Sequence, residues 1–316
     1  MTDTEKFVAI EKANGVDLEF LGNLTWFTIT DCRIKRADLE AMFTEAGIDN
    51  AYMPKEINKR DAFRRAAKVG EVKKAPLNDD QFLNVMVRDV RQDKDNIIKQ
   101  LVREVVDAKN ERLEYKPVAN LSLFDELHVI PIVDMNYSER LAASKIESAF
   151  EIEKENYDGR TIRNIVMNVL KDCKPVAVRP SGGVYFVPQE YQPIIDSLRV
   201  FVERASDHSI TGFKSRLYKV PVVNAEEQLQ MLEESLEDQV KAEAGSMVEE
   251  MTKLIKSGKD ISQSAAAKYI QRVKDLSNMV KRYEEMLNTQ IVEAQADLEL
   301  VTKQAMKVLD KVEAAA

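Results

Sequence analysis

The region after residue 224 constrains the fold of this chain most strongly, because it can form little other than long helices. It contains no Pro, no Trp and only two Gly, and residues that favour helices dominate. Thirteen apolar residues from Tyr269 to Val312 are spaced three or four apart, with a mean step of about 3.6, so they occupy one helix face. A second apolar stripe runs from Leu229 to Leu254. The pattern predicts two long amphipathic helices.

The turn between these helices is predicted around Gly258. Gly suits the left-handed position that ends a helix, and Asp260 or Ser262 suits the N-cap of the next helix. We therefore predict a long antiparallel α-helical hairpin, similar to a coiled coil, with arms at 225–256 and 262–313.

The two arms differ in length. At 1.5 Å per residue they would measure about 48 Å and about 78 Å, so the second arm would overhang the first by about 20 residues. Two successive steps of four, around Leu287 and Ile291, interrupt the heptad spacing, and we interpret them as a drift in register rather than a break. The overhang must bury its stripe on another chain or on the N-terminal part of its own chain. The stripe predicted to contact a partner helix comprises Leu287, Ile291, Leu298, Val301 and Val308.

Most of the net charge lies on the first arm. The chain has 46 Lys and Arg against 54 Asp and Glu, a net charge of −8. Residues 224–256 hold nine Asp and Glu against three Lys, which places −6 on one helix. Residues 1–223 are nearly neutral, so the overall charge does not exclude a local basic surface. We interpret the acidic arm as a solvated face, with a surface for a basic partner as the alternative.

Residues 1–223 mix strand and helix patterns, so we predict an α+β fold that precedes the helical hairpin. We expect three domains: an α+β domain with a β-meander at 1–135, a winged-helix-like segment at 136–223, and the hairpin at 224–316. Residues 97–108 also fit one helix face, but their Val and Ile content favours a strand. The other patterns predict strands at 24–30, 82–90, 113–118 and 127–133, and helices at 36–46 and 58–69.

Residues 136–223 follow the element order of a winged helix-turn-helix. The patterns predict, in order, helices at 138–155 and 160–173, a hairpin with strands at 175–180 and 184–188, and a helix at 189–205. Arg, Asn and Lys on the open face of the second helix are the residue types that contact bases and phosphates. The candidate nucleic-acid-binding residues are Arg160, Arg163, Asn164, Asn168 and Lys171, with Arg179 in the hairpin. The alternatives are an ordinary amphipathic helix packed on a hairpin, or a protein adaptor.

A second basic cluster lies within 55–74. Its predicted patch comprises Lys59, Arg60, Arg64, Arg65 and Lys68. We interpret this patch as a solvated face. The alternatives are that it holds phosphates or an acidic partner helix, or that it pairs with the acidic arm within the molecule or in an oligomer.

Sequence motifs of enzymes and metal sites are absent. There is no Gly-x-x-x-x-Gly-Lys-Ser/Thr or Gly-x-Gly-x-x-Gly loop. The two cysteines, Cys32 and Cys173, lie far apart in the sequence, and no His or Cys spacing typical of zinc occurs. We expect a non-catalytic protein with no cofactor and no metal, and with two reduced thiols. No signal peptide and no stretch of about 18 uncharged apolar residues is found, so we expect a cytoplasmic protein with no membrane partner.

Three motifs occur in order after Leu-Thr-Trp at 24–26. They are Asp-Ala-Phe-Arg-Arg-Ala at 61–66, Leu-Val-Arg-Glu at 101–104 and Ser-Gly-Gly-Val-Tyr-Phe-Val-Pro at 181–188. Together they resemble a family of uncharacterised hypothetical proteins from phages and bacterial mobile elements, over roughly residues 20–220. The resemblance implies an accessory role in the bacterial host, such as replication, takeover or counter-defence, and it transfers no functional residues.

These observations predict a non-catalytic interaction protein of phage or mobile-element type. It would form a homo-oligomer, or bind a host or phage protein, through residues 224–316. The alternative is a DNA-binding accessory protein that uses the winged-helix-like segment.

Overall fold

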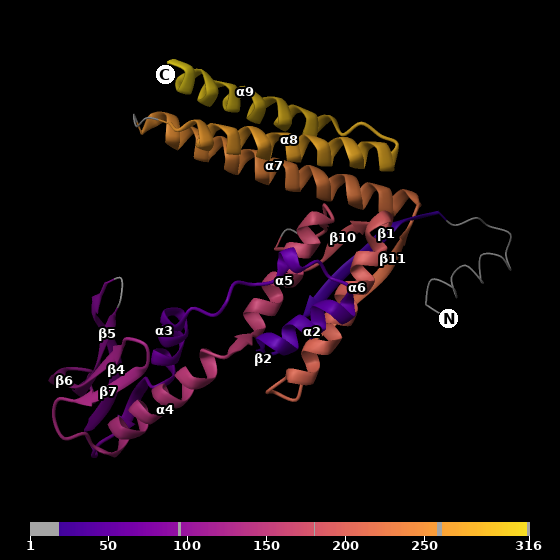
Figure 1. The fold of residues 1–316 in the computed structure, drawn as a ribbon. Coiled ribbons are helices and arrows are strands. Elements are labelled where there is room, and N and C mark those ends of the chain that lie inside the picture. Colours follow the sequence, from indigo (N-terminus) through magenta and orange to yellow (C-terminus); the bar gives the residue numbers. More distant parts are fainter. Residues whose placement is uncertain (1–18, 94–95, 180, 258–260, 315–316) are drawn as a thin grey trace.

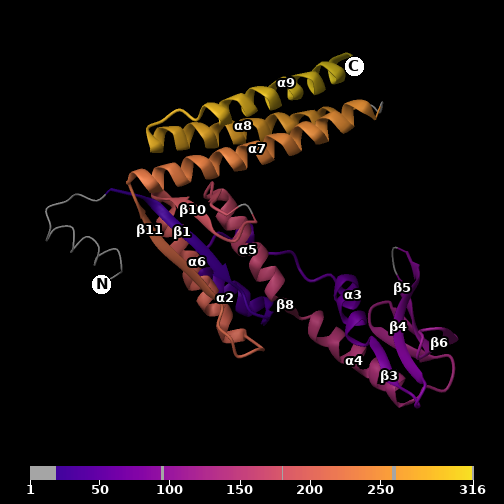
Figure 2. The same cartoon turned by 180° about the vertical axis from the view of Figure 1, so that it is seen from behind.

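The computed structural model describes residues 19–93, 96–179, 181–257 and 261–314. The predicted α+β architecture is confirmed, and the elements pack around three hydrophobic cores. A helical bundle crosses one end of a central unit, and a β-meander lies at the other end (Figures 1 and 2). Within the described ranges, no helix is both long enough and apolar enough to cross a bilayer.

The central unit is built on a four-stranded antiparallel sheet with the order β11-β1-β10-β9. Its strands are β1 (Phe20–Thr28), β9 (Val176–Ala177), β10 (Tyr185–Pro188) and β11 (Arg216–Val223). Three helices share a core with one face of this sheet: α2 (Arg36–Ala46), α5 (Gly159–Asp172) and α6 (Gln192–Ala205). The other face contributes Leu21, Val176, Phe186 and Val222 to the core of the bundle. The sheet therefore separates two cores.

The meander is a five-stranded antiparallel sheet with sequential strand order. Its strands are β3 (Val72–Pro76), β4 (Gln81–Gln92), β5 (Ile97–Asp107), β6 (Arg112–Leu123) and β7 (Leu127–Pro131). The predicted strand at 97–108 is thus confirmed. Two helices, α3 (Lys59–Val69) and α4 (Tyr137–Glu153), pack on the sheet. A short ladder of β2 (Arg33–Lys35) with β8 (Asn156–Asp158) lies where the chain returns to the central unit.

The C-terminal region is a three-helix bundle, and the predicted two-armed hairpin is wrong. Its helices are α7 (Glu226–Lys256), α8 (Gln263–Leu287) and α9 (Val292–Ala314). The predicted second arm breaks at Asn288, which has a left-handed φ of 51° and ends α8. The side chain of Glu284 accepts a hydrogen bond of 2.9 Å from the backbone N–H of Ile291. The two successive steps of four in the apolar stripe therefore mark a break, not a drift.

The break removes the overhang that would have required a partner. The chain reverses after α8, and α9 packs beside both α7 and α8 (Figures 1 and 2). The predicted partner-helix stripe is therefore buried inside the same chain, because α9, which carries most of it, folds back against α7 and α8. The buried residues are Leu287, Ile291, Leu298, Val301 and Val308.

The winged-helix-like segment has the predicted order of elements, but it does not form one unit. Helix α4 shares a core with the meander, whereas α5 and α6 share a core with the four-stranded sheet. Strand β10 also pairs with β1, which lies near the start of the described chain. The cores therefore divide the chain differently from the predicted boundary at residue 135, because burial of apolar faces links segments that are distant in sequence.

Candidate functional site

A groove lies where the C-terminal end of α5, the β9–β10 hairpin and the bundle meet. It has two lobes, which share Lys171, Pro175, Gln239 and Glu243. We call the lobe beside the hairpin the hairpin lobe, with a volume of about 590 Å³. We call the lobe between α7 and α8 the bundle lobe, with a volume of about 250 Å³.

The hairpin lobe has an apolar floor and polar walls. One wall is a stripe of α7 with the helical spacing i, i+3, i+4, i+7, i+8, made of Ser235, Asp238, Gln239, Ala242 and Glu243. The facing wall is Met167 and Lys171 of α5. The hairpin supplies the remaining lining residues, which are Pro175, Ala177, Val178 and Tyr185. The lobe can therefore receive an apolar group and a charged group together.

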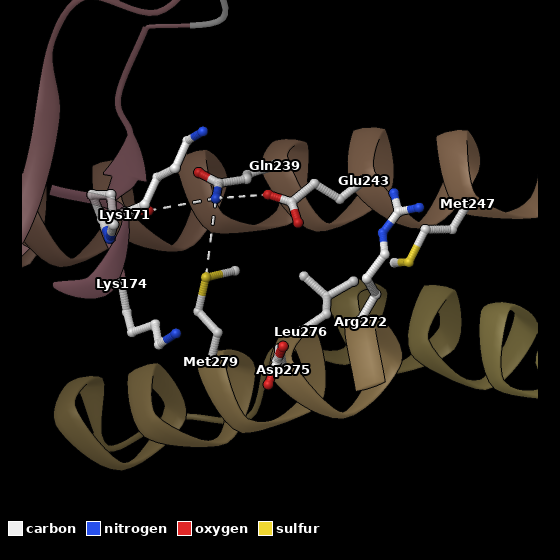
Figure 3. A pocket seen from close by; sticks show the side chains of 10 residues that line it. Lys171, Lys174, Gln239, Glu243, Met247, Arg272, Asp275, Leu276 and Met279 are labelled. Carbon is white, nitrogen blue, oxygen red and sulfur yellow. Dashed lines mark hydrogen bonds between the residues drawn. The ribbon is translucent and has the colours of Figure 1, made fainter. Parts of the chain in front are cut away.

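The bundle lobe continues the groove over the seam between α7 and α8 (Figure 3). Leu276 and Met279 of α8 line it with Met247 of α7, beside the charged groups of Arg272 and Asp275. Figure 3 shows Lys171 and Lys174 at the opposite end of this lobe from Arg272. The lobe is smaller and more polar than the hairpin lobe, so we assign it the minor role in binding.

The local sequence explains how the α7 wall arises. The buried stripe of α7 includes Leu232, Leu236 and Val240, which pack in the bundle core. Asp238 and Gln239 lie beside this stripe on the helix surface, so burying the stripe brings them to the edge of the sheet.

The hairpin end of the groove depends on unusual backbone conformations. Lys174 has a φ of 50° and turns the chain from α5 into β9. Gly182 and Gly183 have φ values of 73° and 93°, as predicted for a tight hairpin turn. The turn holds β9 beside β10, and these strands form the floor of the hairpin lobe. The conformation of this backbone must therefore be stabilised by contacts with other residues.

Tyr283→Phe is expected to lower the free energy of unfolding by about 1–2 kcal/mol. The Tyr283 hydroxyl donates a hydrogen bond of 2.8 Å to the carbonyl of Lys174, and its ring packs edge-on against Phe186. Burial also raises the pKa of Tyr283. Removing the hydroxyl leaves a carbonyl at the groove without its donor. Urea denaturation measures the loss. Tyr269→Phe on the same helix, which removes only a longer, exposed hydrogen bond of 3.3 Å to Glu250, is the control and should cost less.

Gln239 joins the bundle to the edge of the sheet. Its Oε1 accepts a hydrogen bond of 2.9 Å from the backbone N–H of Ala177. Its Nε2 donates to Glu243 at 3.0 Å and to the carbonyl of Pro175 at 3.4 Å. Figure 3 shows this side chain between Glu243 and Met279. A single carboxamide thus binds one backbone group of β9, the outermost strand, and one of the residue that precedes it.

The α7 wall carries negative charge, and Lys171 on the facing wall is the cation that lines the same lobe. Among the described residues, neither Asp238 nor Glu243 forms an ion pair within 4 Å; Glu243 accepts a hydrogen bond from Gln239 and interacts electrostatically with Arg272. Burial and the nearby carboxylates, first among them Glu293, raise the pKa of Glu237. Arg272 in the bundle lobe is already paired with Glu250 at 2.7 Å. The groove therefore presents an acidic wall to a ligand.

The structure brings together most of the predicted nucleic-acid-binding residues. The guanidinium of Arg163 already makes one hydrogen bond within the protein, because its Nη2 donates to the carbonyl of Ile29 at 3.1 Å. Lys171 also lines the groove. All five predicted residues of α5, Arg160, Arg163, Asn164, Asn168 and Lys171, are exposed, as is the acidic Asp172 on the same helix, and Arg179 is exposed between β9 and β10.

The predicted basic patch on α3 is used within the meander unit. Lys59 donates to the carbonyl of Asp125 at 3.0 Å, and Arg60 donates to backbone carbonyls of the β4–β5 turn. Arg64 pairs with Asp61, and Arg65 pairs with Glu153, each at 2.5 Å. Lys68 is exposed. The alternative of a pairing with the acidic arm within the same chain is not found among the described residues, because local carboxylates and carbonyls bind these side chains.

Cys32 and Cys173 are expected to resist Ellman's reagent in the native protein. Both thiols are buried, and burial raises the pKa of each from 9.0 to about 11. Since the folded-state pKa is raised, the stability contributed by the neutral thiols is complete below about pH 9 and is lost as the pH rises through about 11. A native thiol that reacts within seconds would contradict this assignment.

The α7 wall was missed by the prediction from sequence. The apolar stripe of this helix and its total charge predicted a helical arm, and neither of them indicates a role for the polar residues that flank the stripe. A signal was present in the spacing of Ser235, Asp238, Gln239 and Glu243. Nothing in the spacing indicates that this flank meets β9, which lies much earlier in the chain. Among the described residues, no three His, Cys, Asp or Glu side chains converge as a metal site would require.

Comparison with known proteins places the chain in a family. No curated protein and no solved structure matches it. A model of a family of unknown function, DUF6744, matches residues 20–315, which include the sheet, the groove and all three bundle helices. The chain belongs to this family of unknown function, DUF6744.

Proposed function

We propose that this protein is a non-catalytic interaction protein that binds a segment of a partner protein in the groove between α5, the β9–β10 hairpin and α7. The observation that carries the proposal is the hairpin lobe, which combines an apolar floor with an acidic wall. Recognition sites of this kind bury an apolar anchor and orient it with a few polar groups. The contribution of residues 224–316 to binding is then the flank of α7, because the apolar stripe is buried in the bundle.

The chemistry of the groove defines the partner segment. Met167, Val178 and Tyr185 offer apolar surface to one large side chain. Asp238 and Glu243 attract a Lys or Arg on the facing side, and the −6 balance of residues 224–256 steers such a segment to the groove. The expected ligand is therefore a basic segment with an apolar anchor.

The biological setting is part of the same proposal. The motifs at 61–66, 101–104 and 181–188 resemble proteins of phages and mobile elements. We infer that the protein acts in the cytoplasm of a bacterial host and that its partner is a host or phage protein. Takeover of a host process and counter-defence both require such a contact.

A random dodecapeptide display library, selected on the full chain, tests the binding proposal. The peptides recovered are expected to place Lys or Arg beside a large apolar residue. Asp238→Lys combined with Glu243→Lys is expected to weaken their binding at least about tenfold, because it reverses the charge of the wall. Glu249→Lys, on an exposed part of α7 outside the groove, is the matched control. Equal binding by all three proteins would refute the proposal.

A second candidate is binding of DNA along α5. The observation that favours it is the exposure of Arg160, Arg163, Asn164 and Asn168 on one helix, together with the exposure of Arg179 in the hairpin. Such binding would weaken steeply with salt, and Arg163→Ala and Lys171→Ala would each reduce it. Arg160 separates the two candidates, because it lies outside the groove and its loss would weaken only binding of DNA. No affinity for duplex DNA at low salt eliminates this candidate.

A further inference from the structure

The hydrogen bonds of Gln239 indicate the backbone conformation in which the partner segment binds. Resting on the proposed function, we propose that the partner segment binds as an extended strand along the outer edge of β9 and displaces the carboxamide of Gln239. The partner is thus a peptide whose main chain, as well as its side chains, is recognised.

The register of the hairpin defines which backbone groups face the groove. Val176 lies opposite Phe186, and the N–H of Val178 donates to the carbonyl of Val184 at 3.1 Å. Hydrogen-bonded and non-hydrogen-bonded pairs alternate in an antiparallel ladder. The N–H and C=O of Ala177 therefore point away from β10, towards the groove.

Gln239 occupies the place of a neighbouring strand. Its carboxamide accepts from the N–H of Ala177 and donates to the C=O of Pro175, two residues earlier. An adjacent strand would bind the same two groups through its own C=O and N–H. Because β9 is the last strand of its sheet, no further strand of the described chain satisfies them. Gln239 is therefore a positioning residue that keeps the edge satisfied until a peptide replaces it.

The surroundings of β9 explain the pattern expected in the peptide. The sheet lies between α5 on one face and α7 on the other, and side chains of a strand alternate between faces. A strand added at this edge would direct one residue to Met167 on α5 and the next to Asp238 on α7. This alternation accounts for an apolar residue directly beside a basic one. The lobe of about 590 Å³ runs along this edge and provides the space.

The test uses a dodecapeptide selected from the display library as the probe. Each backbone amide of the peptide is N-methylated in turn, and affinity for the unaltered full chain is measured by fluorescence anisotropy. Strand pairing predicts a loss of about tenfold or more at one or two alternate positions, because those N–H groups donate to the sheet edge. Side-chain recognition alone predicts a uniform and small effect, which would overturn the inference.

The protein variant provides an independent measurement. Gln239→Ala is expected to bind the peptide about threefold tighter or more, because no carboxamide has to be displaced. Gln230→Ala removes an exposed Gln on the same helix, whose Nε2 donates to Glu234, and should leave the affinity unchanged. Thermal melting verifies that both variants fold. The N-methyl scan is measured on the unaltered protein, so it does not depend on either variant.

The outcomes separate this inference from the proposed function. If peptides bind with the expected dependence on Asp238 and Glu243, but neither N-methylation nor Gln239→Ala acts as stated, the strand inference is wrong and the function stands. If the library gives no peptide, or if charge reversal of the wall has no effect, both are wrong.

Discussion

Glu139→Ala is expected to lower the free energy of unfolding by about 3 kcal/mol, because it removes the buried carboxylate that pairs with Arg103 and leaves that guanidinium only the longer contact of 3.6 Å with Glu114. Glu139 is fully buried, and its two carboxylate oxygens accept from the guanidinium of Arg103, one of them at 2.7 Å. The same carboxylate accepts from the backbone N–H of Asn136 at 2.8 Å and completes the capping box of α4. One side chain therefore ties β5 to the start of α4.

Urea denaturation, followed by circular dichroism, measures this effect. Glu147→Ala, at an exposed position of the same helix, should change the free energy of unfolding by less than about 0.5 kcal/mol. Replacing both Arg103 and Glu139 with Met should cost less than Glu139→Ala, because no charge is then left buried. A loss below about 1 kcal/mol in Glu139→Ala would contradict the role assigned to the pair.

Val301→Asp is expected to destabilise the bundle by about 4 kcal/mol or more, since it buries a charge that has no partner. Val301 is 0% exposed in the core between the three helices, whereas its neighbour Leu300 is 55% exposed. Leu300→Asp is therefore the matched control and should have little effect. The comparison tests directly whether α9 folds back on its own chain.

A continuous second arm would give a different result. In that arrangement α9 would project beyond α7, and Val301→Asp would alter association of the chains rather than the stability of one chain. Thermal melting combined with sedimentation distinguishes the two cases. A stable, folded Val301→Asp protein with an altered mass would show that the bundle does not form as described.

The break at Asn288 illustrates why the second arm was predicted incorrectly. Apolar spacing of three and four continues through the break, because the turn between α8 and α9 leaves the stripe almost in phase. Asn adopts the left-handed conformation at small cost, so no Gly or Pro marks the position. What ends the helix is the gain from burying the stripe against α7, which is a long-range effect that a local pattern does not contain.

The meander shows the opposite case. The β-branched content of 97–108 favoured a strand over an equally regular helical spacing, and the structure confirms β5. The helices at 36–46 and 59–69 likewise follow from their own apolar faces and from the Gly that comes after each. These elements were predictable because each one is specified by residues within about 12 positions of one another.

The candidate groove, unlike these elements, depends on contacts between segments that are distant in the sequence. Its walls come from α5, from the hairpin and from α7, and the bond between Ala177 and Gln239 spans 62 residues of sequence. Lys171 was predicted as a functional residue from its place on an open helix face, but its neighbours in the groove were not. Local spacing predicts which face of a helix is polar, but it does not predict which other element that face will contact.

The sequence by itself determined the α+β class, the helical character of the region after residue 224, the strand at 97–107, the hairpin turn at Gly182 and Gly183, and the acidity of α7. Only the tertiary structure decided that the second arm forms two helices, that α4 packs on the meander and not with α5, and that Gln239 hydrogen-bonds to the edge of β9. The reason is that the former depend on the periodicity and backbone preference of adjacent residues, whereas the latter depend on which apolar faces bury one another.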